Sequence, residues 1–197
     1  MATATEAAPR ILWPQLTRAD LEHLTGPTAK FEANLAATTL LRQIEAEGRP
    51  ASADDRQVLQ CYTGWGGLPA SFNLEAGDST WVERARRLQA MLSAEDYESA
   101  RASVNNSHYT EVHVIEAIWQ AVERFGFTGG RILEPAAGIG HFIGAMPRHL
   151  PEHRSITTVE IDRFPAASSR RSMRPVAWTC GSRRSRRQRC PTTGSTW

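Results

Sequence analysis

The fold of this chain is decided by residues 131–140, which read RILEPAAGIG. The first four residues predict a short buried strand, and the glycines predict a tight loop, which a helix follows to about Met146. A second strand is predicted from Ser155 to Ile161. The order strand, glycine loop, helix, strand opens a doubly wound parallel sheet, so we expect an α/β fold.

The loop after the first strand is also a candidate binding site. In such a loop the backbone can approach a ligand closely, and the N–H groups of the next helix point toward it. The second strand ends at Glu160, 20 residues after Gly140, where a carboxylate can accept hydrogen bonds from ribose hydroxyls. Many α/β proteins use a glycine loop as a plain turn, so it is the spacing to Glu160 that favours a nucleotide-like ligand.

A nicotinamide-dependent dehydrogenase would also place an acidic residue at the end of the second strand. Its G-x-G-x-x-G pattern is missing here, however, because the third glycine, Gly144, falls one position late. Glu134 stands before the loop, and a carboxylate there suits a ligand with a cationic amino-acid end better than a pyrophosphate. The loop therefore favours a ligand other than a dinucleotide.

A third motif, His-Tyr-Thr at residues 108–110, precedes a predicted helix with an apolar face over residues 112–125. Thr110 is a candidate N-cap of this helix. Together with the glycine loop and Glu160, the motif resembles the adenine-N6 group of the amino-type DNA methyltransferases. In that group a Tyr-Thr motif opens the domain, a Glu-Pro-x-x-Gly-x-Gly loop follows the first strand, and an acidic residue ends the second.

The resemblance is more specific than this group. Residues 31–73, with Gly-Trp-Gly-Gly-Leu-Pro at 64–69, look like the front of large mobile-element proteins that join a DNA methylase to a superfamily 2 helicase. The resemblance covers residues 28–163 and implies an incomplete Rossmann-like, S-adenosylmethionine-dependent methyltransferase domain whose partner is DNA. We expect Trp65 to be a buried anchor of its turn, and His141 to be an incidental loop residue without a chemical role.

The resemblance also implies contacts with the cofactor, S-adenosylmethionine. Tyr109 and Thr110 would border its methionine part, Glu160 would hold the ribose, and Ile161 would pack on the adenine. The loop would cradle the amino-acid end through Glu134, Pro135, Ala136, Gly138 and Gly140.

The sequence contains no catalytic motif of this family. Adenine methylation needs a flipped base, held by stacking and by acceptors for its exocyclic amine. In the resembled family an Asn/Asp-Pro-Pro-Tyr/Phe motif after the fourth strand supplies them, and here no Asn or Asp precedes a Pro-Pro pair. Two strands of a seven-stranded sheet are predicted. We therefore assign no catalytic residue and expect the chain to be inactive on its own.

Residues 164–197 form a tail with eight arginines and no carboxylate, whereas the rest of the chain has 15 basic and 21 acidic residues. Such a tail can bind nucleic acid by neutralising phosphates, so a non-enzymatic nucleic-acid-binding module is the alternative function. The tail has no periodicity, and we expect it to be disordered.

The composition of this tail is also typical of GC-rich DNA read out of frame. Permitted codons allow a shifted frame with an acidic, Pro-rich stretch before Phe-Asp-Leu, so the hypothesis is a frameshift near residues 163–170.

Four segments are predicted along the chain: a loose leader at 1–27, a helical region at 28–104, the start of the methyltransferase domain at 105–163, and the tail at 164–197. Within the helical region, helices are expected at 29–47, from Ser52 to about Tyr62, around 81–91 and around 94–102.

The composition excludes several other classes of protein. A chain of 197 residues with 41% hydrophobic content can form a packed core. No apolar run approaches the ~20 residues that cross a bilayer, and the first residues lack a secretion signal. The three cysteines fit neither a zinc site nor a disulfide framework. We therefore expect a cytoplasmic protein with no membrane or metal partner.

Overall fold

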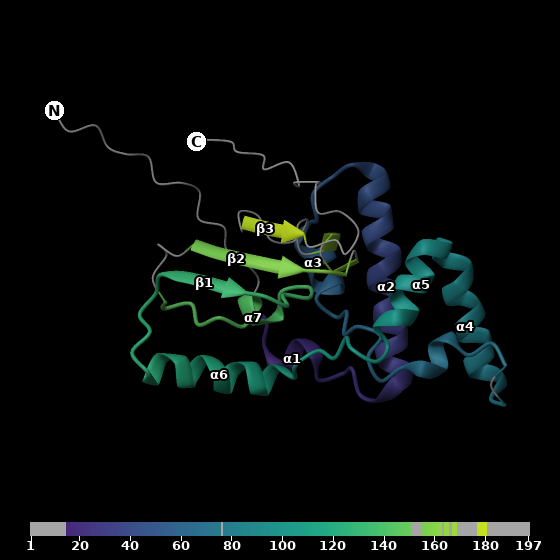
Figure 1. Ribbon diagram of the computed structural model, residues 1–197, viewed down its shortest axis with the longest axis horizontal. Helices are drawn as coiled ribbons and strands as arrows, with labels where there is room; N and C mark the ends of the chain where they lie inside the picture. Colours follow the sequence, from purple (N-terminus) through teal and green to yellow (C-terminus); the bar gives the residue numbers. More distant parts are fainter. Residues whose placement is uncertain are drawn as a thin grey trace.

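The computed structural model describes residues 15–75, 77–150, 155–162, 164–165, 167–168 and 177–180. The elements in chain order are α1 (Arg18–Leu21), α2 (Gly26–Glu47), α3 (Ala53–Leu59), the 3-10 helix η1 (Pro69–Phe72), α4 (Ser79–Met91), α5 (Ala94–Ser103), α6 (Val112–Arg124), β1 (Arg131–Glu134), α7 (His141–Gly144), β2 (Ser155–Glu160) and β3 (Ala177–Cys180). Figure 1 shows a helical part, α2 to α5, toward which the strands of a small sheet point.

The long helix α2 organises the helical part. It has Pro27 in its first turn, and it ends where Gly48 takes a left-handed φ of 65°, a conformation that suits glycine. The side chains that α2 buries recur at intervals of three and four residues, so they share one face of the helix. They are Phe31, Asn34, Ala37, Thr38, Leu41 and Ile44. The helix predicted over residues 29–47 is confirmed, with a start three residues earlier.

Aromatic rings fill the core under this face. Trp65 is 3% exposed, and its ring meets those of Phe31, Tyr62 and Phe72 edge-on, at centroid distances of 6.0, 6.3 and 5.6 Å. Edge-to-face pairs add roughly 0.5–1.5 kcal/mol to the hydrophobic gain of burial. The prediction that Trp65 is a buried anchor of its turn is therefore confirmed.

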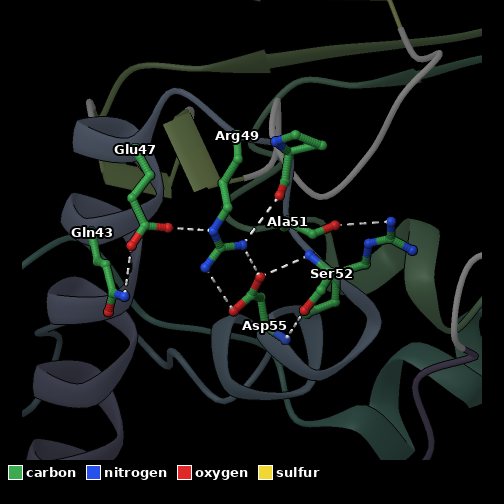
Figure 2. A network of polar contacts seen from close by, with 8 residues as sticks. Gln43, Glu47, Arg49, Ala51, Ser52 and Asp55 are labelled. Carbon is green, nitrogen blue, oxygen red and sulfur yellow. Dashed lines mark hydrogen bonds and ion pairs between the residues drawn. The ribbon is translucent and has the colours of Figure 1, made fainter.

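A polar network connects the end of α2 to the start of α3 (Figure 2). Ser52 is the N-cap of α3 and forms a capping box with Asp55, whose carboxylate accepts a hydrogen bond from the Ser52 N–H at 2.8 Å. The Arg49 guanidinium pairs with both Asp55 and Glu47. The Arg49 guanidinium and the Ser52 groups lower the pKa of Asp55 to about 2. These contacts set the turn between the two helices.

The other predicted helices of this part are also present. Helices α4 and α5 match the predictions around residues 81–91 and 94–102. Helix α3 begins after Ser52 as expected but ends at Leu59, short of the predicted end near Tyr62. Tyr62, which follows the end of this helix, instead lies in the core at 3% exposure, and its ring packs edge-on against that of Trp65. No helix of the described part of the chain is long and apolar enough to cross a membrane.

The sheet has three parallel strands in the order β1-β2-β3. Arg131 pairs with Ser155 and Glu134 with Thr158, so the ends of β1 and β2 lie close together. Helix α6 covers one face of the sheet, because Val112, Ile115 and Trp119 pack in a cluster with Ile132 and Ile156. The cluster also contains Leu16, Ile143, Ala145, Met146 and Leu150. The sequence order strand, glycine loop, helix, strand is confirmed, although α7 ends at Gly144, before the predicted Met146.

The third strand corrects two expectations. Ala177–Cys180 lies within the segment expected to be disordered, and it pairs with β2 in parallel, with Thr157 opposite Ala177. The expectation of a two-stranded sheet is therefore wrong. An open edge on β2 offers unpaired N–H and C=O groups, and a short extended segment can satisfy them whatever its composition. The other tail residues, apart from 164–165 and 167–168, lie outside the described residues.

Residues 15–27 do not belong to a loose leader, although the sequence predicted one over residues 1–27. Thr17 and Asp20 form a capping box at the short helix α1. Leu16 is 3% exposed, and its N–H donates to the Gly144 carbonyl at 3.0 Å. Leu16 is therefore packed against α7, Arg18 of α1 pairs with Glu116 of α6 at 3.0 Å, and residue 26 already belongs to α2.

Candidate functional site

The glycine loop lies at the carboxyl end of β1 and is bonded to the neighbouring strand. The Ala137 N–H donates to the Val159 carbonyl at 3.0 Å, and the Gly140 N–H donates to the Ala137 carbonyl at 2.8 Å. Gly138 and Gly140 have positive φ values of 54° and 97°. Gly140 is the N-cap of α7, so the loop is held both by β2 and by the helix that follows it.

Glu160 lies at this loop, as its spacing predicted. It is 9% exposed, and one carboxylate oxygen, Oε2, accepts a hydrogen bond from the Gly138 N–H at 2.6 Å. The other oxygen, Oε1, accepts from the N–H groups of Ile161 and Asp162, at 2.7 and 2.8 Å. A carboxylate has about four acceptor positions, and three of them are occupied here. One acceptor position of the Glu160 carboxylate therefore remains for a hydroxyl donor. To accept hydrogen bonds from two hydroxyls, the carboxylate would have to lose one of its bonds to a backbone N–H.

The side chains around Glu160 differ in exposure. Burial, followed by the charge of Glu160, raises the pKa of Asp162. Ile161 is 51% exposed, so its apolar side chain is open to a planar ligand. On the other side of the loop, the half-buried Glu134 accepts a hydrogen bond from the Ala136 N–H at 3.2 Å. Pro135 and Ala136 are exposed.

Tyr109 packs directly against the loop. Its hydroxyl is buried, and a Cβ atom at Gly138 would lie 3.0 Å from both Cε1 and the hydroxyl oxygen of Tyr109. A side chain at residue 138 would press on the Tyr109 ring, and the positive φ of 54° also favours glycine there. Burial, followed by Tyr62 and Glu160, raises the pKa of the Tyr109 phenol. The hydroxyl makes no well-formed hydrogen bond with any described residue, although the Ile139 backbone amide is near enough to oppose this rise in pKa.

Thr110 follows Tyr109 but does not cap the next helix. The N-cap of α6 is Glu111, and no side chain accepts a hydrogen bond there, so the expectation that Thr110 caps this helix is wrong. Thr110 is exposed, and it lines a pocket of about 110 Å³ together with Tyr109, His141 and Lys30. The helix itself begins at Val112, where the sequence predicted it, with Glu111 and not Thr110 in the N-cap position.

His141 has a structural role that the sequence did not predict. It is 7% exposed, and its Nε2 lies 2.8 Å from the Gln60 carbonyl oxygen. Because a carbonyl can only accept, Nε2 carries the hydrogen and Nδ1 is an acceptor, which has no partner among the described residues. Burial lowers the pKa of His141, which keeps the ring neutral. The expectation of an incidental loop residue is therefore wrong: His141 begins α7 and bonds it to the helical part.

A cavity of about 360 Å³ lies between α2, α5 and the residues that follow β2. Its lining includes the ring of Tyr62, the ring of Phe164, the carboxyl of Asp162, and the ion pair between Arg42 and Asp96 at 3.1 Å. Ligands of open α/β sheets bind outside the carboxyl ends of the strands, and this cavity adjoins the carboxyl end of β2.

The structure thus brings together most of the residues that the sequence singled out. Tyr109, Gly138 and Glu160 are in contact or hydrogen-bonded around one loop. The sequence did not single out Asn34. The one indication of its role is its place among the apolar positions of α2, where a polar side chain needs a hydrogen-bond partner. Within the described residues, no group of three or more His, Cys, Asp or Glu side chains could hold a metal ion.

Comparisons with known proteins add little to this geometry. No protein-family model matches the chain, and no curated protein matches it. A solved protein-L-isoaspartate O-methyltransferase is similar in structure with 16% sequence identity and a TM-score of 0.33, over 74% of this chain and 42% of that chain. The chain thus spans less than half the length of that protein, and at this TM-score the likeness carries no argument.

Proposed function

We propose that this chain is the S-adenosylmethionine-binding part of a DNA adenine-N6 methyltransferase of the methylase and helicase type. The observation that supports this most directly is the hydrogen bond from the Gly138 N–H to Glu160 at 2.6 Å. It joins a glycine loop and an acidic strand end at the carboxyl edge of a parallel sheet, an arrangement typical of sites for ribose-containing ligands. The strand order β1-β2-β3 agrees with one half of a doubly wound sheet.

Each residue of the site has a definite task in this proposal. Glu160 accepts from a ribose hydroxyl, and Ile161, which is 51% exposed, packs on the adenine. The loop from Glu134 to Gly140 surrounds the amino-acid end, which the Glu134 carboxylate attracts through its amine. Tyr109 and Thr110 border the methionine part. When bound, the cofactor supplies an electrophilic methyl group; the residues of this chain bind and orient it.

Methyl transfer itself is not assigned to these 197 residues. The sequence has no Asn/Asp-Pro-Pro-Tyr/Phe motif to hold a flipped adenine and accept hydrogen bonds from its amine. We propose that this chain binds the cofactor without methylating DNA, that a shifted reading frame encodes the missing motif, and that the protein acts in the cytoplasm.

A second candidate function follows from the charge of the tail. Residues 164–197 contain eight arginines and no carboxylate, so the chain would bind nucleic acid through phosphates without any enzymatic step. Binding of this kind weakens steeply with salt and is lost when the tail is deleted.

Calorimetric titration of the full chain with S-adenosylmethionine tests the first proposal. Ile161→Ala removes an exposed side chain that would pack on the adenine, so we expect weaker binding without a loss of stability. Phe125→Ala is the matched control, because Phe125 is also an exposed apolar residue, 89% exposed at the end of α6. Wild-type protein that binds no cofactor, or equal affinities for the two variants, would contradict the proposed site.

A further inference from the structure

The tight turn of the helical part, residues 64–67, lies directly against Tyr109 and the segment before it. The Gly66 N–H donates to the Ser107 carbonyl at 3.0 Å, and a Cβ atom at Gly66 would lie 2.0 Å from that oxygen. A Cβ atom at Gly64 would lie 2.7 Å from Cε2 of Tyr109. No larger residue fits at either position, so the two glycines allow the turn to touch the Tyr109 segment.

Asn34 holds this turn from the other side. Its side chain is fully buried in α2, and Nδ2 donates to the Gly64 carbonyl at 2.6 Å. Oδ1 accepts from the Thr63 N–H at 2.7 Å. Both polar atoms of one amide side chain are thus used on consecutive residues of the turn, which fixes the backbone where it meets Tyr109.

Tyr109 transmits this contact to the glycine loop. One edge of its ring faces Gly64, and the opposite edge and the hydroxyl face Gly138 at the close distances described above. Tyr62 and His141 pack edge-on against the same ring, with centroids at 5.8 and 5.4 Å. The ring is therefore held between a turn of the helical part and the loop at the carboxyl end of β1.

We propose that the turn at residues 64–67, anchored by Asn34, positions Tyr109 and through it the glycine loop for the cofactor. Asn34 and Gly64 are then positioning residues of the cofactor site, although neither lies in the α/β unit. This inference rests on the proposed function for the identity of the ligand. The coupling of turn, ring and loop is a property of the chain without any ligand.

Two alanine substitutions in the same turn separate this role from general stability. Gly64 and Gly67 have φ values of 73° and 74°, so alanine strains the backbone equally at both positions. The new methyl group strikes Tyr109 in Gly64→Ala, whereas no atom lies within 4 Å of it in Gly67→Ala. The two variants therefore differ in their contact with Tyr109.

The measurement is hydrogen exchange of the amides of residues 136–140 in the full chain, with titration of S-adenosylmethionine alongside. We expect Gly64→Ala to speed exchange in the loop and to raise the dissociation constant by at least about tenfold, while Gly67→Ala leaves both near wild type. Asn34→Ala is expected to act like Gly64→Ala. Ile44→Ala, which empties a fully buried position further along α2, controls for lost stability and leaves the loop unchanged when the protein is folded.

The possible failures can be told apart. Equal loop exchange in Gly64→Ala and Gly67→Ala overturns the positioning role, whether or not the cofactor binds. If wild-type protein binds no S-adenosylmethionine but Gly64→Ala still loosens the loop, the proposed function fails and the mechanical coupling stands. Faster loop exchange in Ile44→Ala equal to that in Asn34→Ala also overturns the positioning role.

Discussion

The helical part and the sheet of this protein differ in how well their apolar side chains are covered. In the helical part Phe31, Ile44 and Leu88 are fully buried. At the sheet, α6 covers one face, yet Leu133 of β1 is 64% exposed and Ile161 after β2 is 51% exposed. Parallel sheets are normally covered on both faces, whereas a helix completes its hydrogen bonds within its own segment. Helices can therefore bury their apolar side chains with a short length of chain, whereas a parallel sheet needs more chain to cover both of its faces.

The largest expected effect is on the core of the helical part. Trp65→Ala removes a ring that three other rings contact, so we expect a loss of about 3–5 kcal/mol in the free energy of unfolding. Denaturant unfolding followed by circular dichroism measures it. Phe125→Ala, at an 89% exposed residue, is the control and should stay within roughly 0.5 kcal/mol of wild type. Similar losses for the two variants would contradict the assignment of the core to this part.

The next effect concerns the contact between the two parts. Gly66→Ala places a methyl group 2.0 Å from the Ser107 carbonyl oxygen, which forces the turn away from the segment before α6. We expect a loss of about 1–3 kcal/mol in the free energy of unfolding, as is typical of overpacking. Gly77→Ala is the control, because no atom lies within 4 Å of its new methyl group. An unchanged Gly66→Ala variant would mean that the turn and the Ser107 segment are not in contact in solution.

A smaller effect is expected from pH at the link between Gln60 and His141. Burial lowers the pKa of His141 in the folded state. As the pH falls, the histidine of the unfolded chain is therefore protonated before that of the folded chain, near its ordinary pKa of about 6.5. This contribution to stability is present above pH 6.5 and is lost as pH falls, by at most about 1.4 kcal/mol per pH unit. Unfolding measured from pH 7.5 to 5 should show less pH dependence in His141→Gln than in wild type. An unchanged slope would indicate that His141 is accessible to protons when folded.

The smallest effect is expected at the polar turn before α3. The pKa of Asp55 is lowered to about 2, so its contribution is present above the ordinary pKa near 4 and is lost as pH falls toward 2. Asp55→Asn should remove this acid dependence at a cost of about 0.5–2 kcal/mol near neutral pH, the usual range for a helix cap. Asp54→Asn, one residue earlier in the first turn of α3, is the control. Equal changes in both variants would show that first-turn charge, and not the capping box, is responsible.

The sequence anticipated the local elements well, and the reasons are physical. Helices α2, α4, α5 and α6 follow from apolar side chains repeated every three or four residues and from stops such as Gly48. Spacing placed Glu160 at the end of the second strand as an acceptor for ribose hydroxyls, but it did not indicate the hydrogen bond from the Gly138 N–H. The sequence did not indicate β3, because Ala177–Cys180 has no pattern of its own and is a strand only through pairing with β2.

The sequence by itself determined the longer helices α2, α4, α5 and α6, the first two strands and the glycine loop, because each depends on neighbouring residues and their periodicity. The tertiary structure decided the environment of the site. Asn34 meets Gly64 across 30 residues, and His141 meets Gln60 across 81. Such contacts depend on how distant segments fold together, and no local pattern encodes them. For the same reason, the sequence predicts only that Tyr109 precedes a helix, whereas the tertiary structure places its ring between two glycines.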